Sequence, residues 1–346
     1  MRCCSGLSGS GLSKRAHLTS LNLKVLNPKV RRRRYSALVQ NWYAYQAMVI
    51  RGTTQLLGVI GYPVKHSFSP LMHNAAIAHL QAQQADQDSF DSQLDYVYLP
   101  FPIEPARLED AIAGFSAIGL RGFNITIPHK QTIIPLLDSV SEVARAIGAV
   151  NTAWHTDQGW QGTNTDALGF LAPLKALPRN WKNSQAVILG NGGAARAVVA
   201  ACQQLGCSRI CVVGRSPEKL THFAESWVNA PEIASRLKIL TWDELSSQLP
   251  ETDLLVNATP VGMHPNVGAS PVSDQVMAQV KGDAIAYDLI YTPRPTTFLQ
   301  QASAHGLVAI DGLEMLVQQG AAALEIWLNQ SAPVDVMRQA LLDYLN

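Results

Sequence analysis

Short apolar segments alternate with helix-like segments along the chain from Leu56 onward. The apolar segments are rich in Val, Ile, Leu and Tyr, whereas the stretches between them repeat apolar residues at helical spacing. This alternation is typical of α/β proteins, in which helices cover a mainly parallel sheet. The predicted strands are Leu56–Ile60, Tyr96–Leu99, Gly122–Ile125, Ala186–Leu189, Ile210–Val213, Leu254–Asn257, Ala284–Leu289 and Val308–Ile310.

One region departs from this alternation. The sequence AWHTDQGWQG (residues 153–162) has turn residues between two short extended segments, which favours a hairpin. A helix is predicted over Asp166–Ala176, followed by a polar link at residues 178–180, so the chain changes domain here. We therefore expect an N-terminal extension (1–51), an α/β domain (52–164), a second α/β domain (165–311) and two amphipathic helices (312–346) that pack back on one of the domains.

The composition favours a folded protein over a disordered or fibrous one. Of the 346 residues, 47% are hydrophobic and 15% are charged, which is enough to bury the cores of two domains. No uncharged apolar run of about 18 residues occurs, so we expect a soluble protein without a membrane span. The cysteines are odd in number and lack C-x-x-C pairs, which favours reduced thiols over disulfides or a metal site. They are Cys3, Cys4, Cys202, Cys207 and Cys211.

Charge is distributed unevenly between the N-terminal extension and the rest of the chain. Residues 1–51 hold ten of the 27 Lys and Arg residues and no Asp or Glu, which leaves 17 basic and 26 acidic residues in the rest. The extension fits a transit peptide, a nucleic-acid arm built on Arg31–Arg34, or sequence upstream of a true start at Met48, and we favour the last. The acidic body opposes phosphate binding, so we expect no nucleic-acid partner. We expect a cytoplasmic protein, or plastid import if the extension is native.

A dinucleotide-binding fingerprint follows the predicted strand Ala186–Leu189. The strand leads into GNGGAAR and then into a helical segment, which is the context that this motif needs. Gly190 permits a tight turn, Gly192 permits close approach of a pyrophosphate, and Ala195 is a small third position. Backbone N–H groups at the helix start are expected to hold the phosphates. The predicted cofactor-binding residues here are Gly190, Asn191, Gly192, Gly193, Ala194 and Ala195.

The end of the next predicted strand indicates which cofactor is bound. About 20 residues after the glycine turn, an NAD site places an Asp or Glu against the ribose 2′-hydroxyl. This chain has Arg215 and Ser216 there. A guanidinium and a hydroxyl can bind a 2′-phosphate, so we predict NADP rather than NAD. Farther on, Asn257–Thr259 lies at a strand end, where a nicotinamide contact and a structural role are both compatible with the sequence.

Polar residues gather at predicted strand ends and helix starts in the first domain. Ser69 is placed to cap a helix whose first residue is Pro70. The sequence GFNITIPHK (residues 122–130) is expected to lead from a strand into another helix, with Pro128 in its first turn. Such hydroxyl, amide and charged side chains suit a small molecule that carries hydroxyls and a carboxylate. The set consists of Ser67, Ser69, Asn124, Thr126, Lys130, Asn151 and Asp166.

Lys130 and Asp166 carry the predicted chemistry. Hydride delivery to a ketone leaves negative charge on oxygen, so the site needs a proton donor within hydrogen-bond reach. The Lys130 ammonium can supply that proton, and the Asp166 carboxylate can keep it charged and oriented while accepting a hydrogen bond from a substrate hydroxyl. We interpret His66, His73 and His129, which lie near these motifs, as solvent-facing or helix-packing side chains.

Eight ordered motifs resemble the shikimate dehydrogenase family over nearly all of the chain from Leu56 to Asn346. They are HSFSP, GFNITIPHK, GAVNT, GTNTDALGF, GNGGAAR, NATPVGM, YDLIYTPRPT and DGLEMLVQQGAAALEIW. The resemblance implies an N-terminal substrate-binding domain, an NADP-binding Rossmann domain with a parallel sheet, and C-terminal helices that return to the substrate domain. It also implies reversible reduction of 3-dehydroshikimate to shikimate, in the pathway to chorismate and aromatic amino acids.

The resemblance further implies roles for single residues. Lys130 and Asp166 match the family's catalytic pair, and Leu289 and Gly312 match its backbone contacts to the nicotinamide. At the 2′-phosphate the family usually has Asn-Arg-Thr, and this chain keeps the arginine and a hydroxyl in Gly214, Arg215 and Ser216. The substrate carboxylate is matched by Ser67, Ser69 and Tyr291, and the ring hydroxyls by Asn124, Thr126, Asn151 and Gln319.

Two other functions remain open from the sequence. A quinate/shikimate dehydrogenase of broader range is disfavoured by the serine pair and by the absence of an acid beside Arg215. A binding or regulatory protein without catalysis is disfavoured because Lys130 and Asp166 are intact. The expected partners are shikimate and 3-dehydroshikimate, with no nucleic acid, membrane or metal. A homodimer is left open.

Overall fold

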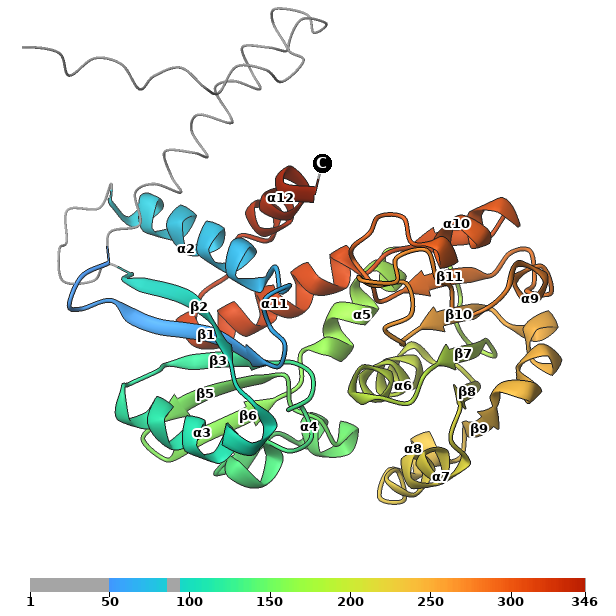
Figure 1. Cartoon of the computed structure of the whole chain (residues 1–346), viewed down its shortest axis with the longest axis horizontal. Helices are drawn as coiled ribbons and strands as arrows, with labels where there is room; N and C mark the ends of the chain where they lie inside the picture. Colours follow the sequence, from blue (N-terminus) through green and yellow to red (C-terminus); the bar gives the residue numbers. More distant parts are fainter. Residues whose placement is uncertain (1–49, 86–93, 346) are drawn as a thin grey trace, which may run out of the picture. The chain divides into compact units, whose positions relative to one another are not determined.

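Two six-stranded sheets with helices around them make up the part of the chain that the computed structural model describes, residues 50–85 and 94–345 (Figure 1). All eight predicted strands are present, and the predicted α/β class is confirmed. Residues 1–49, which hold most of the basic extension together with Cys3 and Cys4, lie outside the described residues.

The first sheet has the strand order β2-β1-β3-β5-β6-β4. The central strand β1 is parallel to both of its neighbours, and β5 and β6 form the hairpin that the sequence predicts. The edge strand β4 was not predicted, because it is only two residues long. The strands are β1 (Gln55–Gly61), β2 (Tyr96–Pro102), β3 (Gly122–Ile125), β4 (Ser139–Val140), β5 (Thr152–Thr156) and β6 (Gly159–Thr163).

Helices pack on both faces of this sheet. Leu57, Val59 and Tyr98 share a core with α2 and the two C-terminal helices, whereas Ile60 and Phe123 pack on the other face with α3. Successive side chains of a strand point to opposite faces, which accounts for the separation of Val59 from Ile60. The helices are α2 (Ser69–Ala85), α3 (Leu108–Ala117), α11 (Leu313–Leu328) and α12 (Val334–Leu345).

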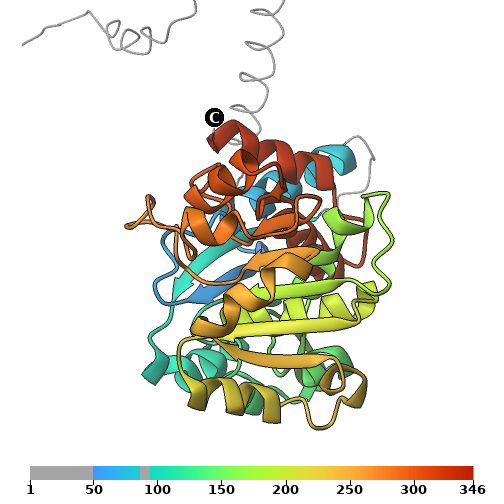
Figure 2. The same cartoon turned by 90° about the vertical axis from the view of Figure 1, so that its right-hand side faces the viewer.

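The second sheet is parallel throughout and has the order β12-β11-β10-β7-β8-β9 (Figure 2). The chain order reverses between β7 and β10, and open α/β sheets bind ligands beyond the carboxyl ends of the strands at such a point. The edge strand β9 was not predicted. The strands are β7 (Gln185–Leu189), β8 (Arg209–Gly214), β9 (Leu237–Thr241), β10 (Leu254–Asn257), β11 (Ile285–Asp288) and β12 (Val308–Ile310).

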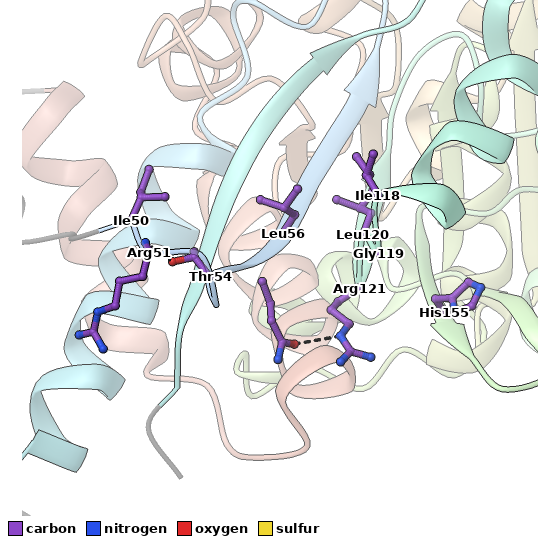
Figure 3. A pocket seen from close by; sticks show the side chains of 10 residues that line it. Ile50, Arg51, Thr54, Leu56, Ile118, Gly119, Leu120, Arg121 and His155 are labelled. Carbon is purple, nitrogen blue, oxygen red and sulfur yellow. Dashed lines mark hydrogen bonds between the residues drawn. The ribbon is translucent and has the colours of Figure 1, made fainter. Parts of the chain in front are cut away.

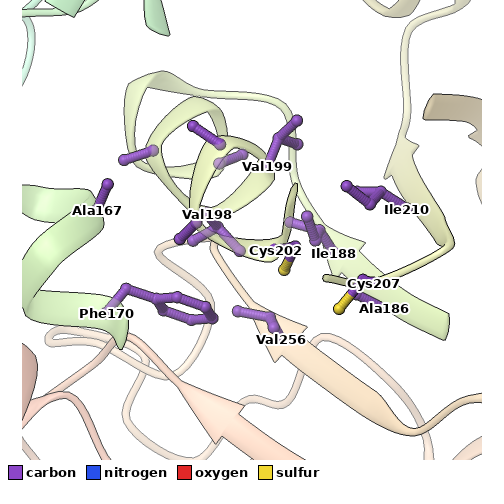
Figure 4. Packing of buried hydrophobic residues seen from close by; sticks show 14 of the residues in the cluster. Ala167, Phe170, Ala186, Ile188, Val198, Val199, Cys202, Cys207, Ile210 and Val256 are labelled. Atoms are coloured by element: carbon purple, nitrogen blue, oxygen red, sulfur yellow. The ribbon is translucent and has the colours of Figure 1, made fainter. Parts of the chain in front are cut away.

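Helix α6, which follows the glycine-rich turn, packs its apolar side against this sheet (Figure 4). Val198 and Cys202 of α6 lie among Ile188, Val256 and Phe170, all fully buried. Burying each large apolar side chain contributes about 1.5–3 kcal/mol. This packing fixes α6 on the sheet, and with it the glycine-rich turn that precedes α6 at the carboxyl end of β7. The helices of this region are α5 (Asp166–Lys175), α6 (Gly193–Leu205), α7 (Pro217–Glu225), α8 (Pro231–Ala234), α9 (Asp274–Met277) and α10 (Thr297–Ala304).

Two local predictions are wrong. The helix expected near Pro128 is absent: residues 127–133 are turns, followed by the short 3-10 helix Ile134–Leu136. Pro135 would lie in the interior of such a helix, where it lacks the backbone N–H that the helix needs. Helix α2 begins at Ser69 itself, and the Ser69 N–H donates to Ser67 Oγ at 3.3 Å, so Ser67 supplies the hydroxyl at this helix start.

The described cysteines are as expected: Cys202, Cys207 and Cys211 are buried free thiols. Within residues 50–85 and 94–345, no three or more His, Cys, Asp or Glu side chains are arranged to hold a metal ion. No described helix is both long and apolar enough to cross a membrane.

Candidate active site

Lys130 and Asp166 form an ion pair across 36 residues of sequence. Lys130 Nζ donates to Asp166 Oδ2 at 2.6 Å, and the side chains are only 16% and 7% exposed. Lys130 lies on the turn after β3, and Asp166 is the first residue of α5, where the helix dipole favours a carboxylate. The pair is therefore fixed by two separate elements and is shielded from solvent, unlike an exposed surface pair.

The stem of Lys130 lies against the glycine-rich turn of the second sheet. A Cβ atom built on Gly193 would lie 3.7 Å from both Cβ and Cδ of Lys130. The predicted proton donor and the predicted phosphate-binding turn are therefore neighbours.

Asn151 connects the ion pair to helix α11. Its Nδ2 lies 2.8 Å from Asp166 Oδ1, 2.9 Å from Thr165 Oγ1 and 3.2 Å from Gln319 Oε1. Its Oδ1 accepts from Thr165 N at 2.7 Å and from Thr152 Oγ1 at 3.0 Å. All five residues are buried, and an unmade hydrogen bond there would cost about 1–3 kcal/mol. The structure therefore brings three predicted site residues, Asn151, Asp166 and Gln319, into one network.

A second branch of the network contains Asn124. Its Nδ2 lies 3.2 Å from both Asn151 O and Thr152 Oγ1, and its Oδ1 accepts from the Tyr98 hydroxyl at 2.7 Å. Sequence reasoning missed Tyr98, Thr152 and Thr165. The sequence places these residues in or beside predicted strands. It does not give the strand register, which decides which side chains contact each other.

The two predicted serines lie on the loop between β1 and α2. Ser69 is buried and Ser67 half-buried. The ring of Phe68, between them, lies 5.6 Å from that of Tyr291. Burial raises the pKa of Tyr291, so its phenol keeps its proton at neutral pH and can donate a hydrogen bond. Thr126 is half-buried directly after β3, so it also lies at the carboxyl end of the first sheet.

The glycine-rich turn has the conformation that the fingerprint requires. Gly190 has φ +104°, which L side chains rarely adopt, and a Cβ there would lie 3.1 Å from Ala258 O. Gly192 is the N-cap of α6 and brings no side-chain cap, so the first N–H groups of this helix are open to an anion. Asn191, Gly193 and Ala194 belong to the same turn, and Ala195 is fully buried in the core behind it.

Arg215 and Ser216 follow β8, beside this turn. Arg215 is exposed, and among the described residues no carboxylate lies within 4 Å of it, so its guanidinium is free to bind an anion. Ser216 is the N-cap of α7, and its hydroxyl accepts from Lys219 N at 3.4 Å. The Ser216 hydroxyl therefore also has a structural task.

The backbone at Leu289 and Gly312 is held closely together. A Cβ on Gly312 would collide with the Leu289 carbonyl, so residue 312 has to be glycine. Asp288, fully buried, accepts from Ile290 N at 3.0 Å, from Asn257 Nδ2 at 3.0 Å and from Thr296 Oγ1 at 2.6 Å. Burial raises the pKa of Asp288 to about 6. The amide of Asn257 is thus used within the protein, which favours the structural role for this residue.

The three histidines near the motifs lie as expected. His66 is exposed, whereas His73 and His129 are fully buried. His129 Nε2 lies 2.8 Å from Ile103 O. Burial lowers the pKa of His73 to about 3, so its ring is neutral.

A groove of about 500 Å³ lies elsewhere on the first sheet (Figure 3). Its lining includes Gln55 and Leu56 at the start of β1 and Arg121 just before β3, the opposite strand ends from those near Lys130. It contains none of the predicted site residues, so it is separate from the site described above.

These features define a class of protein. A parallel sheet with a glycine-rich turn and an exposed arginine after the next strand is typical of NADP-binding domains. A lysine-carboxylate pair that is largely shielded from solvent lies beside that turn, near amides and hydroxyls of the first sheet, and this is what a dehydrogenase of small polar substrates needs.

The chain belongs to the shikimate/quinate dehydrogenase family. Three family models match it: the shikimate dehydrogenase substrate binding domain at residues 59–153, shikimate / quinate 5-dehydrogenase at 173–316, and the shikimate 5'-dehydrogenase C-terminal domain at 312–342. The family resemblance inferred from the eight motifs is confirmed.

Curated relatives match almost over their full length. The shikimate dehydrogenase (NADP(+)) of Gloeothece citriformis is 56% identical over 298 residues, 86% of this chain and 99% of the relative. That of Synechocystis sp. is 58% identical over 296 residues, 86% of this chain and 98% of the relative.

Solved structures share the fold. A shikimate dehydrogenase in complex with NADP+ superposes with a TM-score of 0.75 at 36% identity, over 86% of this chain and 98% of that one. The Thermus thermophilus enzyme in complex with NADP(H) and shikimate gives 0.70 at 33%, over 84% and 99%. A 5-ketofructose reductase of Gluconobacter gives 0.70 at 32%, over 85% and 100%, so the fold by itself does not fix the substrate.

Proposed function

We propose that the chain is an NADP-dependent shikimate dehydrogenase that reversibly reduces 3-dehydroshikimate to shikimate, a step of aromatic amino acid biosynthesis. The observation that carries the proposal is the largely shielded ion pair of Lys130 and Asp166 beside the glycine-rich turn, in a chain 56–58% identical to enzymes of that name.

Lys130 is the proton donor. When the ketone is reduced, charge develops on its oxygen, and an ammonium within hydrogen-bond reach stabilises that charge and transfers a proton. One N–H of Lys130 is bound to Asp166 Oδ2, which orients the ammonium and leaves its other N–H groups for substrate. In shikimate oxidation the same group takes the proton back.

The substrate is held by the first sheet and helix α11. Ser67, Ser69 and Tyr291 bind the carboxylate, because they gather hydroxyl groups around the loop between β1 and α2. Ring hydroxyls lie against buried amides and a hydroxyl at the carboxyl ends of β3 and the hairpin, which can donate and accept in fixed directions. These ring contacts are Asn124, Thr126, Asn151 and Gln319.

NADP is held by the second sheet, and when bound it supplies the hydride. The residues fit this cofactor because the start of α6, from Gly193 to Ala195, offers N–H groups without a side-chain cap to a pyrophosphate. Arg215 offers the 2′-phosphate a cation that has no carboxylate within 4 Å among the described residues. Ser216 adds a hydroxyl there, and the backbone of Leu289 and Gly312 contacts the nicotinamide.

A single assay tests this function. Absorbance of the reduced nicotinamide is followed with shikimate or quinate and with NADP or NAD, using the purified chain. We expect shikimate with NADP to give the highest kcat/KM of the four combinations. A higher kcat/KM with quinate would make the broader quinate/shikimate activity the correct one, and no turnover with any pair would leave a binding protein.

Location and assembly are separate proposals. We infer that the part of the chain from Met48 onward suffices for activity, in the cytoplasm, or in a plastid if residues 1–47 direct import. Mass spectrometry of the native N-terminus distinguishes these cases, because a start at Met48 excludes import by the extension. A homodimer is tested by light scattering of the purified enzyme.

A further inference from the structure

Tyr98 lies on the face of the first sheet that carries the substrate residues, although it belongs to the edge strand β2. In the strand register Tyr98 pairs with Leu57, and Val59, two residues farther along β1, pairs with Asn124. Residues paired in register or two apart point to the same face of a sheet. The Tyr98 side chain therefore extends over β1 and meets Asn124 on β3.

The backbone of Tyr98 is fixed by a side chain of α2. Asn74 Nδ2 donates to Tyr98 O, and Tyr98 N donates to Asn74 Oδ1, both at 2.9 Å. Because β2 is the edge strand, the Asn74 amide takes the place of a further strand. The start point of the Tyr98 side chain is thus set by two hydrogen bonds.

The ring of Tyr98 is held as firmly. It is fully buried and stacks on His73 with centroids 4.3 Å apart and planes at 9°. Trp327 of α11 covers it at 5.9 Å. Within the described residues neither nitrogen of His73 makes a hydrogen bond of normal geometry, although the Asn124 side chain lies near enough to oppose the fall in the pKa of His73 that burial causes. This neutral imidazole therefore serves mainly as a flat packing surface for the Tyr98 ring.

In its hydrogen bond with Asn124, the Tyr98 hydroxyl is always the donor. It lies 2.7 Å from Asn124 Oδ1, and burial raises the pKa of Tyr98 well above its usual range, so the proton stays on the phenol. The Ser69 hydroxyl partly opposes that rise in the pKa of Tyr98. The hydrogen bond from the Tyr98 hydroxyl therefore goes to Asn124, a proposed ring-hydroxyl ligand.

The remaining hydrogen-bonding capacity of Asn124 follows from a count. An amide has two N–H groups and two oxygen lone pairs. Asn151 O and Thr152 Oγ1 take both N–H groups of Asn124, and Tyr98 takes one lone pair. The nearby His73 ring makes no hydrogen bond of normal geometry, so these bonds leave one lone pair on Oδ1, and toward the substrate Asn124 is an acceptor.

We propose that Tyr98 is a positioning residue that determines specificity: by occupying one lone pair of Asn124 Oδ1 and fixing its amide, it presents the other to a substrate group that must be a hydroxyl donor. A carbonyl or a hydrogen at that ring position would leave Oδ1 unpaired. The inference rests on the proposed contact between Asn124 and a ring hydroxyl.

The test is Tyr98→Phe, which keeps the ring, the stack on His73 and both bonds to Asn74. The KM for shikimate should rise about 3- to 10-fold, the factor for one hydrogen bond between neutral groups, with kcat and the KM for NADP nearly unchanged. Tyr287→Phe is the matched control. Tyr287 is also fully buried and stacked at 9°, on Phe170, but its hydroxyl has no partner in the described structure, so its loss should not change the KM.

Two further measurements separate positioning from structure. In the background of Asn124→Ala, Tyr98→Phe should cause no further rise in KM, because the two residues act through one contact. The second measurement uses two substrate analogues, each of which lacks one non-reacting ring hydroxyl. Tyr98→Phe should leave the KM unchanged for the analogue that lacks the hydroxyl bound by Asn124, and should still raise the KM for the other analogue.

The results separate three proposals: the enzyme's function, the contact of Asn124 with substrate, and the role of Tyr98. If the unmodified enzyme does not turn over shikimate, the proposed function is wrong, and if Asn124→Ala leaves the KM unchanged, the Asn124 assignment is wrong. If Asn124→Ala raises the KM while Tyr98→Phe lowers only the melting temperature, or adds its full effect to Asn124→Ala, the role of Tyr98 is purely structural and the inference is overturned.

Discussion

The two sheets build their sites in opposite ways. Around Asn151 the first sheet uses side chains that are bonded to each other, so that Asn151 meets Thr152, Thr165, Asp166 and Gln319 in the protein alone. The second sheet uses backbone: the first residues of α6, Gly193 to Ala195, contribute N–H groups that receive no side-chain cap. The substrate region is thus a network with little spare capacity, whereas the cofactor region is an open anion site.

This difference teaches where specificity lies. An open helix start and an exposed arginine bind phosphate groups, so the cofactor region distinguishes ligands by the phosphates that they carry. A buried network in which nearly every lone pair is used accepts only a ligand that completes it. Substitutions should therefore affect chemistry and substrate choice in the first sheet, and cofactor choice in the second.

The largest expected effect is at the ion pair. Lys130→Ala should lower kcat by roughly 10²–10⁴-fold, the usual contribution of a general acid, and leave the dissociation constant of NADP nearly unchanged. Steady-state kinetics and a cofactor titration measure the two quantities. A near-native kcat would show that Lys130 is not the proton donor. A large loss of NADP binding would show that chemistry and cofactor binding are not divided between the two sheets.

The comparable test in the second sheet is Arg215→Ala. NADP binding should weaken by about 1.5–3 kcal/mol, the range for a hydrogen bond to a charged group, whereas NAD binding should hardly change because NAD lacks the 2′-phosphate. Fluorescence titration with both reduced cofactors provides the comparison, and Arg209→Ala is a control, since that arginine is bound to Glu251. Equal losses for both cofactors would assign Arg215 to the fold.

The same contrast explains what the sequence could predict. The cofactor turn is one contiguous segment, so GNGGAAR after a strand was sufficient to place it. The substrate network joins residues far apart in sequence, such as Asn151 and Gln319, 168 residues apart. Its predicted members came from motifs, and the residues that orient them, Tyr98 and Thr152, depend on register and could not be read from spacing.

The errors in the fold also have local causes. In edge strand β9 (LKILT) the exposed Lys238 interrupts a short apolar run whose Leu240 is buried, so the strand does not show as a continuous apolar segment. The helix expected after β3 was based on Pro128 as a helix start, but Pro135 and the bond from Val150 N to Lys130 O hold this segment as turns. That irregular segment is what places Lys130.

The serines test whether substrate binding and chemistry are separate within the first sheet. Ser67→Ala and Ser69→Ala should each raise the KM for shikimate by about 10- to 150-fold and lower kcat less, because the carboxylate keeps its charge throughout the reaction. Since Ser67 Oγ accepts the Ser69 N–H, Ser67→Ala should also cost some stability, on the order of 0.5–2 kcal/mol. An unchanged KM in both variants, with lower melting temperatures, would make the pair a structural turn.

The smallest expected effect concerns Asp288, the buried last residue of β11 in the second sheet. Burial raises its pKa to about 6, so in the folded state it holds its proton up to a higher pH than in the unfolded chain, where the ordinary value is 3.8. Its contribution to stability is therefore complete below about pH 4 and is lost as the pH rises through about 6.

Asp288→Asn should remove this pH dependence, because the amide resembles the protonated acid: its oxygen can still accept from Ile290 N, and its NH₂ group can donate to Thr296 Oγ1. Between pH 4 and pH 7.5, the unfolding free energy of the unmodified chain should fall relative to the variant by about 1–3 kcal/mol, since one unit of pKa corresponds to about 1.4 kcal/mol. Urea unfolding of both proteins at each pH measures the difference, in which other titrating groups cancel. A parallel pH profile would show that Asp288 stays ionised, and the loops around Leu289 would then be held by charge-assisted bonds.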